Sequence, residues 1–258
     1  MSGHSKWATI KRKKGAADAR RGQLFTKLTR EIMVSAKEGG GDPDANFRLR
    51  LAVQRARAEN MPVDNINRAI ARGSGAGSEG SNYDEITYEG YGPNGVAVLV
   101  QSLTDNRNRT VAEVRAIFTK AGGSLGEAGS VGWMFEPHGV ITIEPKATQD
   151  PDEITLFAID AGAEDVSVEE DEDTADTIVE VVTGFEDLKR VQEALTSAGY
   201  NVTNAETTMM PKTLMSLDDK AIESALRLIE RLEDLDDVQS VYTNLDMANA
   251  EAVMAGMS

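Results

Sequence analysis

The first fifteen residues have the composition of a phosphate-binding arm, because they carry five basic side chains and a tryptophan but no acidic side chain. These residues are Lys6, Trp7, Lys11, Arg12, Lys13 and Lys14. Mobile cations neutralise phosphates and release counterions, and an aromatic ring can stack on a base or a sugar. A second interpretation stays open, in which Trp7 anchors the first helix to the core and the lysines are only solvated.

Six more basic residues extend this candidate nucleic-acid site. They are Arg20, Arg21, Lys27, Arg30, Arg107 and Arg109. The first four continue the arm along a predicted helix, and the last two lie in the turn DNRNRT, where Thr110 is expected to cap another helix. The free N–H groups at a helix start can hold an anion. The alternative is a turn whose polar groups are satisfied by its own side chains.

No residue pattern in the sequence predicts catalysis, a metal site or a cofactor. The chain has no cysteine, and its two histidines, His4 and His138, lie far apart in the sequence. The acidic run at residues 169–173 lacks the alternation and the glycine of a calcium loop, which indicates a solvated hairpin. There is no nucleophile–base pair. We therefore expect no enzyme, no catalytic residues, no metal and no cofactor.

Charge is divided unevenly along the chain. Residues 1–80 carry 16 Lys and Arg against 8 Asp and Glu, a net charge of +8, whereas residues 81–258 carry 11 against 35, a net charge of −24. Such asymmetry indicates one region that meets phosphates and a remainder that repels them. A basic helical domain without a ligand is the alternative.

The basic part of the chain predicts three helices. Leu24, Phe25, Leu28 and Ile32 form the apolar stripe of the first helix, which ends at the glycines of residues 39–41.

A second helix is expected to begin with Asp42 as N-cap and Pro43 as its first residue. Its predicted buried side comprises Leu49, Ala52, Val53 and Ala56. A third helix is expected at residues 63–72. The Gly- and Ser-rich residues 73–81 follow and predict a linker. Their G-x-G-x-x-G letters do not predict a dinucleotide site, because the helix comes before them and the strand after.

Beyond the linker the apolar period changes to two, which indicates strands. The first expected elements are strands at 85–89 and 95–103, a helix at 111–121 and a strand at 131–135. The next are strands at 140–143, 165–168, 178–182 and 200–207, with helices at 151–161 and 185–198. The last are a helix at 218–232 and a strand at 238–243. The middle set has the β-α-β-β-α-β order of a ferredoxin-like unit, whereas the sets on either side are each incomplete.

The predicted fold class is therefore α+β, with an N-terminal three-helix domain and two α/β domains of ferredoxin-like type, one inserted in the other. The expected domains are residues 1–80, residues 81–135 with 211–245, the insertion 136–210 and a C-terminal tail, 246–258. The sequence has neither a transmembrane run nor a secretory h-region. We expect a cytoplasmic protein with no membrane partner and no small-molecule substrate.

Five motifs resemble those of the YebC family of bacterial proteins, which includes mitochondrial relatives that activate translation of a cytochrome oxidase subunit. The motifs are SGHSKWATIKRKKGAADARRGQLFTKLTREI, AENMPVDNINRAIARG, YEGYGPNGVAVLV, TDNRNRT and GSVGWMF. Together they span essentially the whole chain.

The resemblance implies three domains and a regulator of gene expression. Two activities fit it: a DNA-binding transcriptional regulator, and a ribosome-associated translation factor that contacts RNA and relieves stalls at proline-rich sequences. The expected partner is therefore DNA or ribosomal RNA, the latter with the ribosome. No clear helix-turn-helix signature is found, which favours RNA or non-specific DNA contact.

Overall fold

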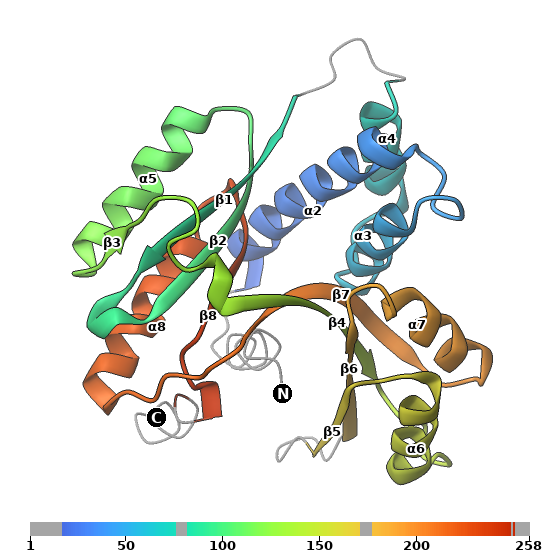
Figure 1. Ribbon diagram of the computed structural model, residues 1–258. Helices are drawn as coiled ribbons and strands as arrows, with labels where there is room; N and C mark the ends of the chain where they lie inside the picture. Colours follow the sequence, from blue (N-terminus) through green and yellow to red (C-terminus); the bar gives the residue numbers. More distant parts are fainter. Residues whose placement is uncertain (1–16, 76–81, 171–176, 249, 251–258) are drawn as a thin grey trace.

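The computed structural model describes residues 17–75, 82–170, 177–248 and 250, with side chains from Arg21 onward except that of Glu170. This part of the chain contains seven α-helices and two four-stranded antiparallel sheets. The fold class is α+β, as predicted. Figure 1 shows the N-terminal helices packed beside both sheets.

The N-terminal helices are α2 (Ala17–Gly39), α3 (Phe47–Ala58) and α4 (Val63–Gly73). Their apolar faces meet in one core, which buries Leu28, Ile32 and Ile66. All four residues of the predicted buried side of α3 are buried. Gly73 allows α4 to approach α2, because a Cβ there would lie 2.3 Å from the carbonyl oxygen of Met33.

Helix α3 begins later than the sequence predicted. Its N-cap is Asn46, whose side-chain oxygen accepts a hydrogen bond from the backbone N–H of Leu49 at 3.1 Å. The amide group of Asn46 also donates to the carbonyl oxygens of Ser35 and Gly40, so this one side chain satisfies the end of α2 and the start of α3. The prediction of Asp42 as N-cap was wrong for this reason.

The first sheet has the strand order β3-β1-β2-β8. Its strands are β1 (Asp84–Tyr91), β2 (Ala97–Thr104), β3 (Ser124–Leu125) and β8 (Val238–Thr243). The helices α5 (Arg107–Lys120) and α8 (Asp219–Glu233) pack in the same core against β2 and β8, where Val100, Phe118, Ile229 and Val241 are buried. This sheet therefore unites segments more than one hundred residues apart in sequence.

The second sheet has the strand order β5-β6-β4-β7. Its strands are β4 (Phe135–Ile143), β5 (Asp165–Glu170), β6 (Thr177–Gly184) and β7 (Val202–Pro211). The helices α6 (Pro151–Ala161) and α7 (Leu188–Ser197) cover one face and share a core with it. Element order and strand order together are those of a ferredoxin-like unit. All four strands come from one continuous stretch of chain.

The boundaries of β4 and α5 differ from the prediction by several residues. Residues 131–135 were expected to be a strand, but a 3-10 turn, η2 (Gly132–Met134), leads directly into β4, which runs unbroken from Phe135 to Ile143. Helix α5 begins at Arg107, four residues before its predicted start. Another 3-10 turn, η1 (Pro93–Gly95), joins β1 to β2.

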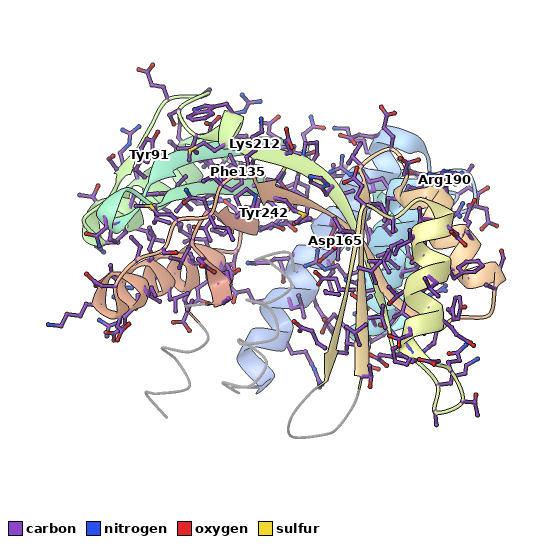
Figure 2. The ribbon with its side chains drawn as sticks, turned by 60° about the horizontal axis from the view of Figure 1, so that its bottom comes forward. Tyr91, Phe135, Asp165, Arg190, Lys212 and Tyr242 are labelled. Carbon is purple, nitrogen blue, oxygen red and sulfur yellow. The ribbon has the colours of Figure 1, made fainter. Side chains whose placement is uncertain are left out.

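A small apolar core joins the two sheets. It includes Leu99 of β2, Tyr242 of β8 and Phe135 at the start of β4, with Met209 of β7 packed against it. Figure 2 shows Tyr242 between the two sheets and Phe135 at the start of β4, beside the first sheet. Among the described residues, no helix is both long and apolar enough to cross a membrane.

Candidate nucleic-acid interface

Helix α2 docks its polar side on the C-terminal end of α8. Gln23 donates to the backbone carbonyl of Asp234 and Lys27 donates to that of Glu233, while Gln23 also reaches the carboxylate of Asp236 at 3.0 Å. The last carbonyls of a helix lack partners within the helix and carry partial negative charge, so a lysine ammonium is favourable there. Lys27 thus stabilises the acidic body.

Asp237, just before β8, is the buried centre of an ion-pair network. Its side chain is 3% exposed. It accepts hydrogen bonds from Arg30 at 3.0 Å, from Arg109 and Thr110 at 2.7 Å each, and from Thr104 at 3.0 Å. The network joins α2, β2 and α5 to the loop between α8 and β8.

Electrostatics favours the charged form of this aspartate. Burial acts to raise the pKa of Asp237, but the hydrogen bonds from Arg109, Thr110 and Thr104 and the charge of Arg30 outweigh burial and hold the pKa below its ordinary value. The structure therefore brings two predicted site residues, Arg30 and Arg109, onto one carboxylate.

The turn before α5 is satisfied by its own side chains. Asn106, not Thr110, is the N-cap, and its side-chain oxygen accepts from the backbone N–H of Arg109 at 3.1 Å. The guanidinium of Arg107 pairs with Asp84 at 2.7 Å, and that of Arg109 also pairs with Asp105 at 2.8 Å. The prediction of Thr110 as cap was wrong. Thr110 lies one turn into the helix, where its hydroxyl donates a hydrogen bond to Asp237.

Helix α3 docks on the second sheet by a different chemistry. Phe47 and Leu51 pack against the core of that unit. Around them, Arg50 pairs with Glu193 of α7 at 3.2 Å, and Gln192 donates to Gln54 at 3.0 Å. The N-terminal helices are thus held by an ionic contact at one end and by a largely apolar contact at the other.

These contacts divide the predicted site residues into three groups. The arm residues Lys6, Trp7, Lys11, Arg12, Lys13 and Lys14 and the side chain of Arg20 lie outside the described part of the chain. Arg21 is exposed. The residues that contact acidic or carbonyl groups of the protein itself are Lys27, Arg30, Arg107 and Arg109.

The exposed cations of α3 and α4 were missed by the sequence analysis. Arg57, Arg68 and Arg72 are exposed, and none of them pairs with a carboxylate within the described residues. Arg68 and Arg72 are four residues apart on α4 and so share one face. The apolar spacing of α4 could have identified these arginines, because Ile66, Ala69 and Ile70 define the opposite face of the helix.

The motifs YEGYGPNGVAVLV and GSVGWMF meet at the edge of the first sheet. Glu89 accepts backbone hydrogen bonds from Gly129, Val131 and Gly132 at 2.6–2.8 Å. Burial acts to raise the pKa of Glu89, but these three donors outweigh it and lower the pKa. The carboxylate therefore fixes the loop that presents Trp133, whose side chain is 66% exposed. A large, fixed and exposed ring is a surface on which an unpaired base can stack.

Two family models match the chain. A model described as "TACO1/YebC protein N-terminal domain" matches residues 5–76, and one described as "TACO1/YebC second and third domain" matches residues 83–245. The chain belongs to the TACO1/YebC family. The resemblance read from the five motifs is confirmed.

Relatives within the TACO1/YebC family match over nearly the full length. A "Probable transcriptional regulatory protein" of Roseiflexus castenholzii is 58% identical over 99% of this chain and 100% of its own. A protein of the same description from Herpetosiphon aurantiacus is 55% identical over 96% of each chain. A conserved hypothetical protein from Aquifex aeolicus with a known crystal structure is 42% identical in sequence to this chain. The two structures superpose with a TM-score of 0.79, and the match covers 90% of this chain and 92% of the other.

Proposed function

We propose that this protein is a regulator of gene expression that binds nucleic acid through its basic N-terminal region. The observation that carries the proposal is the charge division, +8 over residues 1–80 against −24 over the rest. The names of the relatives, probable transcriptional regulatory proteins, support the same class of activity. Phosphate recognition supplies much of the affinity of such proteins, and only the N-terminal region has the necessary charge.

The contact surface that we propose combines the predicted arm with the exposed cations of the helices. Its members are Lys6, Trp7, Lys11, Arg12, Lys13, Lys14, Arg20, Arg21, Arg57, Arg68 and Arg72. Lys27 and Arg30 serve this surface indirectly, because they hold α2 against the acidic body. Arg107 and Arg109 are assigned the same supporting role, since both pair with carboxylates.

A second candidate is contact with RNA at the ribosome, and Trp133 favours it. Its ring stands exposed on a loop fixed by Glu89. Sequence-specific RNA recognition relies on unstacked bases that stack on aromatic side chains. Duplex DNA does not offer such unstacked bases. Crosslinking in cells, followed by sequencing of both bound RNA and bound DNA, separates the two candidates. Ribosomal RNA peaks support the translation factor, and promoter peaks support the transcriptional regulator.

The contact surface is tested by the salt dependence of binding. Replacing Arg68 and Arg72 with alanine should weaken binding and reduce the slope of log K against log salt by up to about 0.9 for each lost contact with duplex DNA, or about 0.7 with single strands. Replacing Arg115 and Arg231 is the matched control, because both are exposed arginines of the acidic body. Equal slopes in the two double variants would exclude α4 from the contact surface.

The basic arm is tested in the same assay. Neutralising Lys11, Arg12, Lys13 and Lys14 together should remove up to about four phosphate contacts. An unchanged affinity and slope would show that the arm does not bind.

A further inference from the structure

The two faces of the second sheet have different surroundings. Ile141, Val181 and Ala205 share a core with α6 and α7, so these helices cover one face. The residues that alternate with them point the other way. We call this second side the inner face, because it is turned toward the first unit (Figures 1 and 2). Strand register places on the inner face the side chains of Val140, Asp165, Glu169, Glu180 and Val182.

The centre of the inner face is buried. Val140 is 1% exposed, Val182 is 5% exposed and Glu180 is 6% exposed. Neither valine belongs to the apolar cores that the described residues form, and α6 and α7 lie behind the sheet. Side chains on an open sheet face are in contact with water. The burial therefore indicates that a further segment of polypeptide lies against the inner face.

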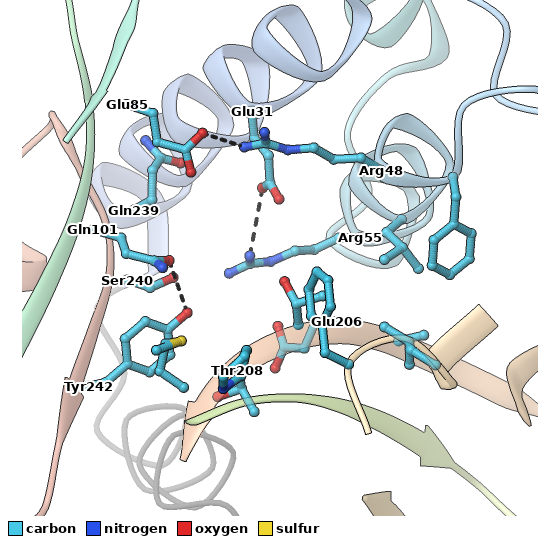
Figure 3. Close-up of a pocket in the computed structure, with 18 of the residues that line it drawn as sticks. Glu31, Arg48, Arg55, Glu85, Gln101, Glu206, Thr208, Gln239, Ser240 and Tyr242 are labelled. Carbon is cyan, nitrogen blue, oxygen red and sulfur yellow. Dashed lines mark hydrogen bonds and ion pairs between the residues drawn. The ribbon is translucent and has the colours of Figure 1, made fainter. Parts of the chain in front are cut away.

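The inner face is also acidic. It carries the carboxylates of Asp165, Glu169 and Glu180, and none of the four strands contains a lysine or an arginine. A carboxylate as buried as that of Glu180 is tolerated only where a cation or several hydrogen-bond donors meet it. Glu206 lies on the same face at the β7 edge, but it is directed toward the guanidinium of Arg55 (Figure 3). The segment that covers the inner face should therefore supply cations.

The chain itself has one segment of this composition. The stretches outside the described residues are 1–16, 76–81, 171–176, 249 and 251–258. Only the first of them contains a lysine or an arginine. It holds the basic arm, which has five cations and no acidic side chain. The arm also has two large apolar side chains, Trp7 and Ile10, whose chemistry matches that of the two buried valines.

The arm can reach the inner face. It leads into α2, and contacts of Gln23 with Asp234 and Asp236 hold the start of α2 beside β8. Figure 1 shows this end of α2 between the two sheets. An extended arm of 15 residues spans about 50 Å. This reach exceeds the diameter of about 30 Å that is expected of a unit as small as residues 135–211.

We propose that the inner face of the second sheet is the docking site of the basic arm of the same chain. Trp7 packs over Val140 and Val182, and the cations of the arm pair with the acidic side chains around them. The arm is then shared between two sites, because the same cations are assigned to nucleic acid in the proposed function, on which this consequence rests. Nucleic acid must displace the arm, so the inner face lowers the affinity of the protein for it.

Tryptophan fluorescence tests the docking without nucleic acid. The chain has two tryptophans, so Trp133→Phe leaves Trp7 as the only reporter. In that background Trp7 should emit at short wavelength and be shielded from acrylamide. Asp165→Asn with Glu180→Gln removes charge at nearly constant volume. This double variant should shift the emission to longer wavelength and raise the quenching constant toward its value in the urea-unfolded protein.

Glu153→Gln with Asp160→Asn is the matched control, because both carboxylates are exposed on α6, behind the sheet. It should leave Trp7 shielded. Urea unfolding shows whether each variant retains its fold. Asp165→Asn with Glu169→Gln leaves the buried carboxylate in place, so it tests the same loss of shielding if the first double variant does not fold. An accessible Trp7 before any charge is removed, or equal shielding in the control and the inner-face variants, would overturn the proposal.

A dilution series identifies whose arm is bound. Shielding that persists on dilution, in a protein that sediments as a monomer, assigns the arm to the same chain. Shielding that is lost on dilution would assign the inner face to the arm of a second copy and would overturn docking within one chain.

The competition with nucleic acid is measured separately, in proteins that retain Trp133. The Asp165 and Glu180 double variant should bind an oligonucleotide at least about fivefold more tightly than the control double variant, which has the same net charge. Equal affinities would overturn the competition. A protein that shields Trp7 but binds no nucleic acid would refute the proposed function and leave the docking site intact, so the two failures are distinguishable.

Discussion

The two α/β units differ in how the chain builds them and in how the N-terminal helices dock on them. The second sheet takes all four strands from the continuous segment 135–211, whereas the first requires β8, more than one hundred residues beyond β2. Helix α3 meets the second unit with Phe47 and Leu51. Helix α2 meets the first through Arg30 and the buried Asp237.

The N-terminal helices are therefore coupled to the two α/β units by two kinds of contact, one apolar and one ionic. An apolar contact is not weakened by screening of charge and depends little on pH, whereas an ionic contact is weakened by acid and, where exposed, by salt. The ionic contact also sits at the point where the split sheet closes, because Asp237 immediately precedes β8. Loss of Asp237 should therefore affect both the closure of the first unit and the docking of the helices.

The largest effect is expected from cutting the chain. We propose that residues 81–135 and 211–245 form one folding unit and that residues 136–210 form another. A fragment of residues 81–135 should not fold, because it lacks α8 and β8 and so exposes the apolar face formed by residues such as Val100 and Phe118. A fragment of residues 135–211 should unfold cooperatively in urea. A cooperative transition of the first fragment would contradict the proposed division.

Local periodicity predicted the elements well. The expected helix at 151–161 and strand at 238–243 coincide with α6 and β8, and the buried side of α3 was identified residue by residue. Each of these depends on apolar spacing within one element, which determines the face that turns inward.

Contacts between distant segments could not be predicted in the same way. Nothing in residues 233–237 distinguishes Asp237 from the other acidic residues there, yet its carboxylate is the one that accepts from Arg30, Arg109 and Thr110. The two arginines were identified as candidates for an external anion because their carboxylate partner lies more than one hundred residues away. A cavity of about 600 Å³ between the N-terminal helices and the two sheets also escaped prediction, since its walls come from all three units.

The second prediction breaks the ionic contact. Asp237→Ala should lower the free energy of unfolding by about 3 kcal/mol, because it leaves the largely buried Arg30 without its carboxylate and the buried hydroxyl of Thr104 without its acceptor. Urea unfolding measures the change. Asp236→Ala is the matched control, since this neighbouring carboxylate is exposed and, within the described part of the chain, contacts only Gln23. Equal losses in the two variants would contradict the role assigned to Asp237.

The third prediction uses pH to weaken the same contact. The pKa of folded Asp237 is held below its ordinary value, so its contribution to stability is complete above about pH 4 and is lost as pH falls through the folded pKa. The free energy of unfolding should therefore fall with acid over this range. Asp237→Asn should fall less steeply, because the amide does not titrate. Parallel pH profiles for the two proteins would show that other carboxylates account for the acid sensitivity.

The smallest effect concerns salt and separates the two docking contacts. If the helices were held by charge alone, the radius of gyration would increase with salt, because exposed charges are screened over about 8 Å at physiological ionic strength. The apolar contact of α3 through Leu51 should instead keep the natural protein compact from low to high salt. Leu51→Ala weakens that contact, so this variant should expand in high salt and remain compact in low salt.

Small-angle scattering across a salt series measures both proteins, with Leu156→Ala as control because that leucine is exposed on α6. An expansion of the natural protein itself would assign the docking to the ionic contact, and a compact Leu51 variant at high salt would show that α3 contributes little.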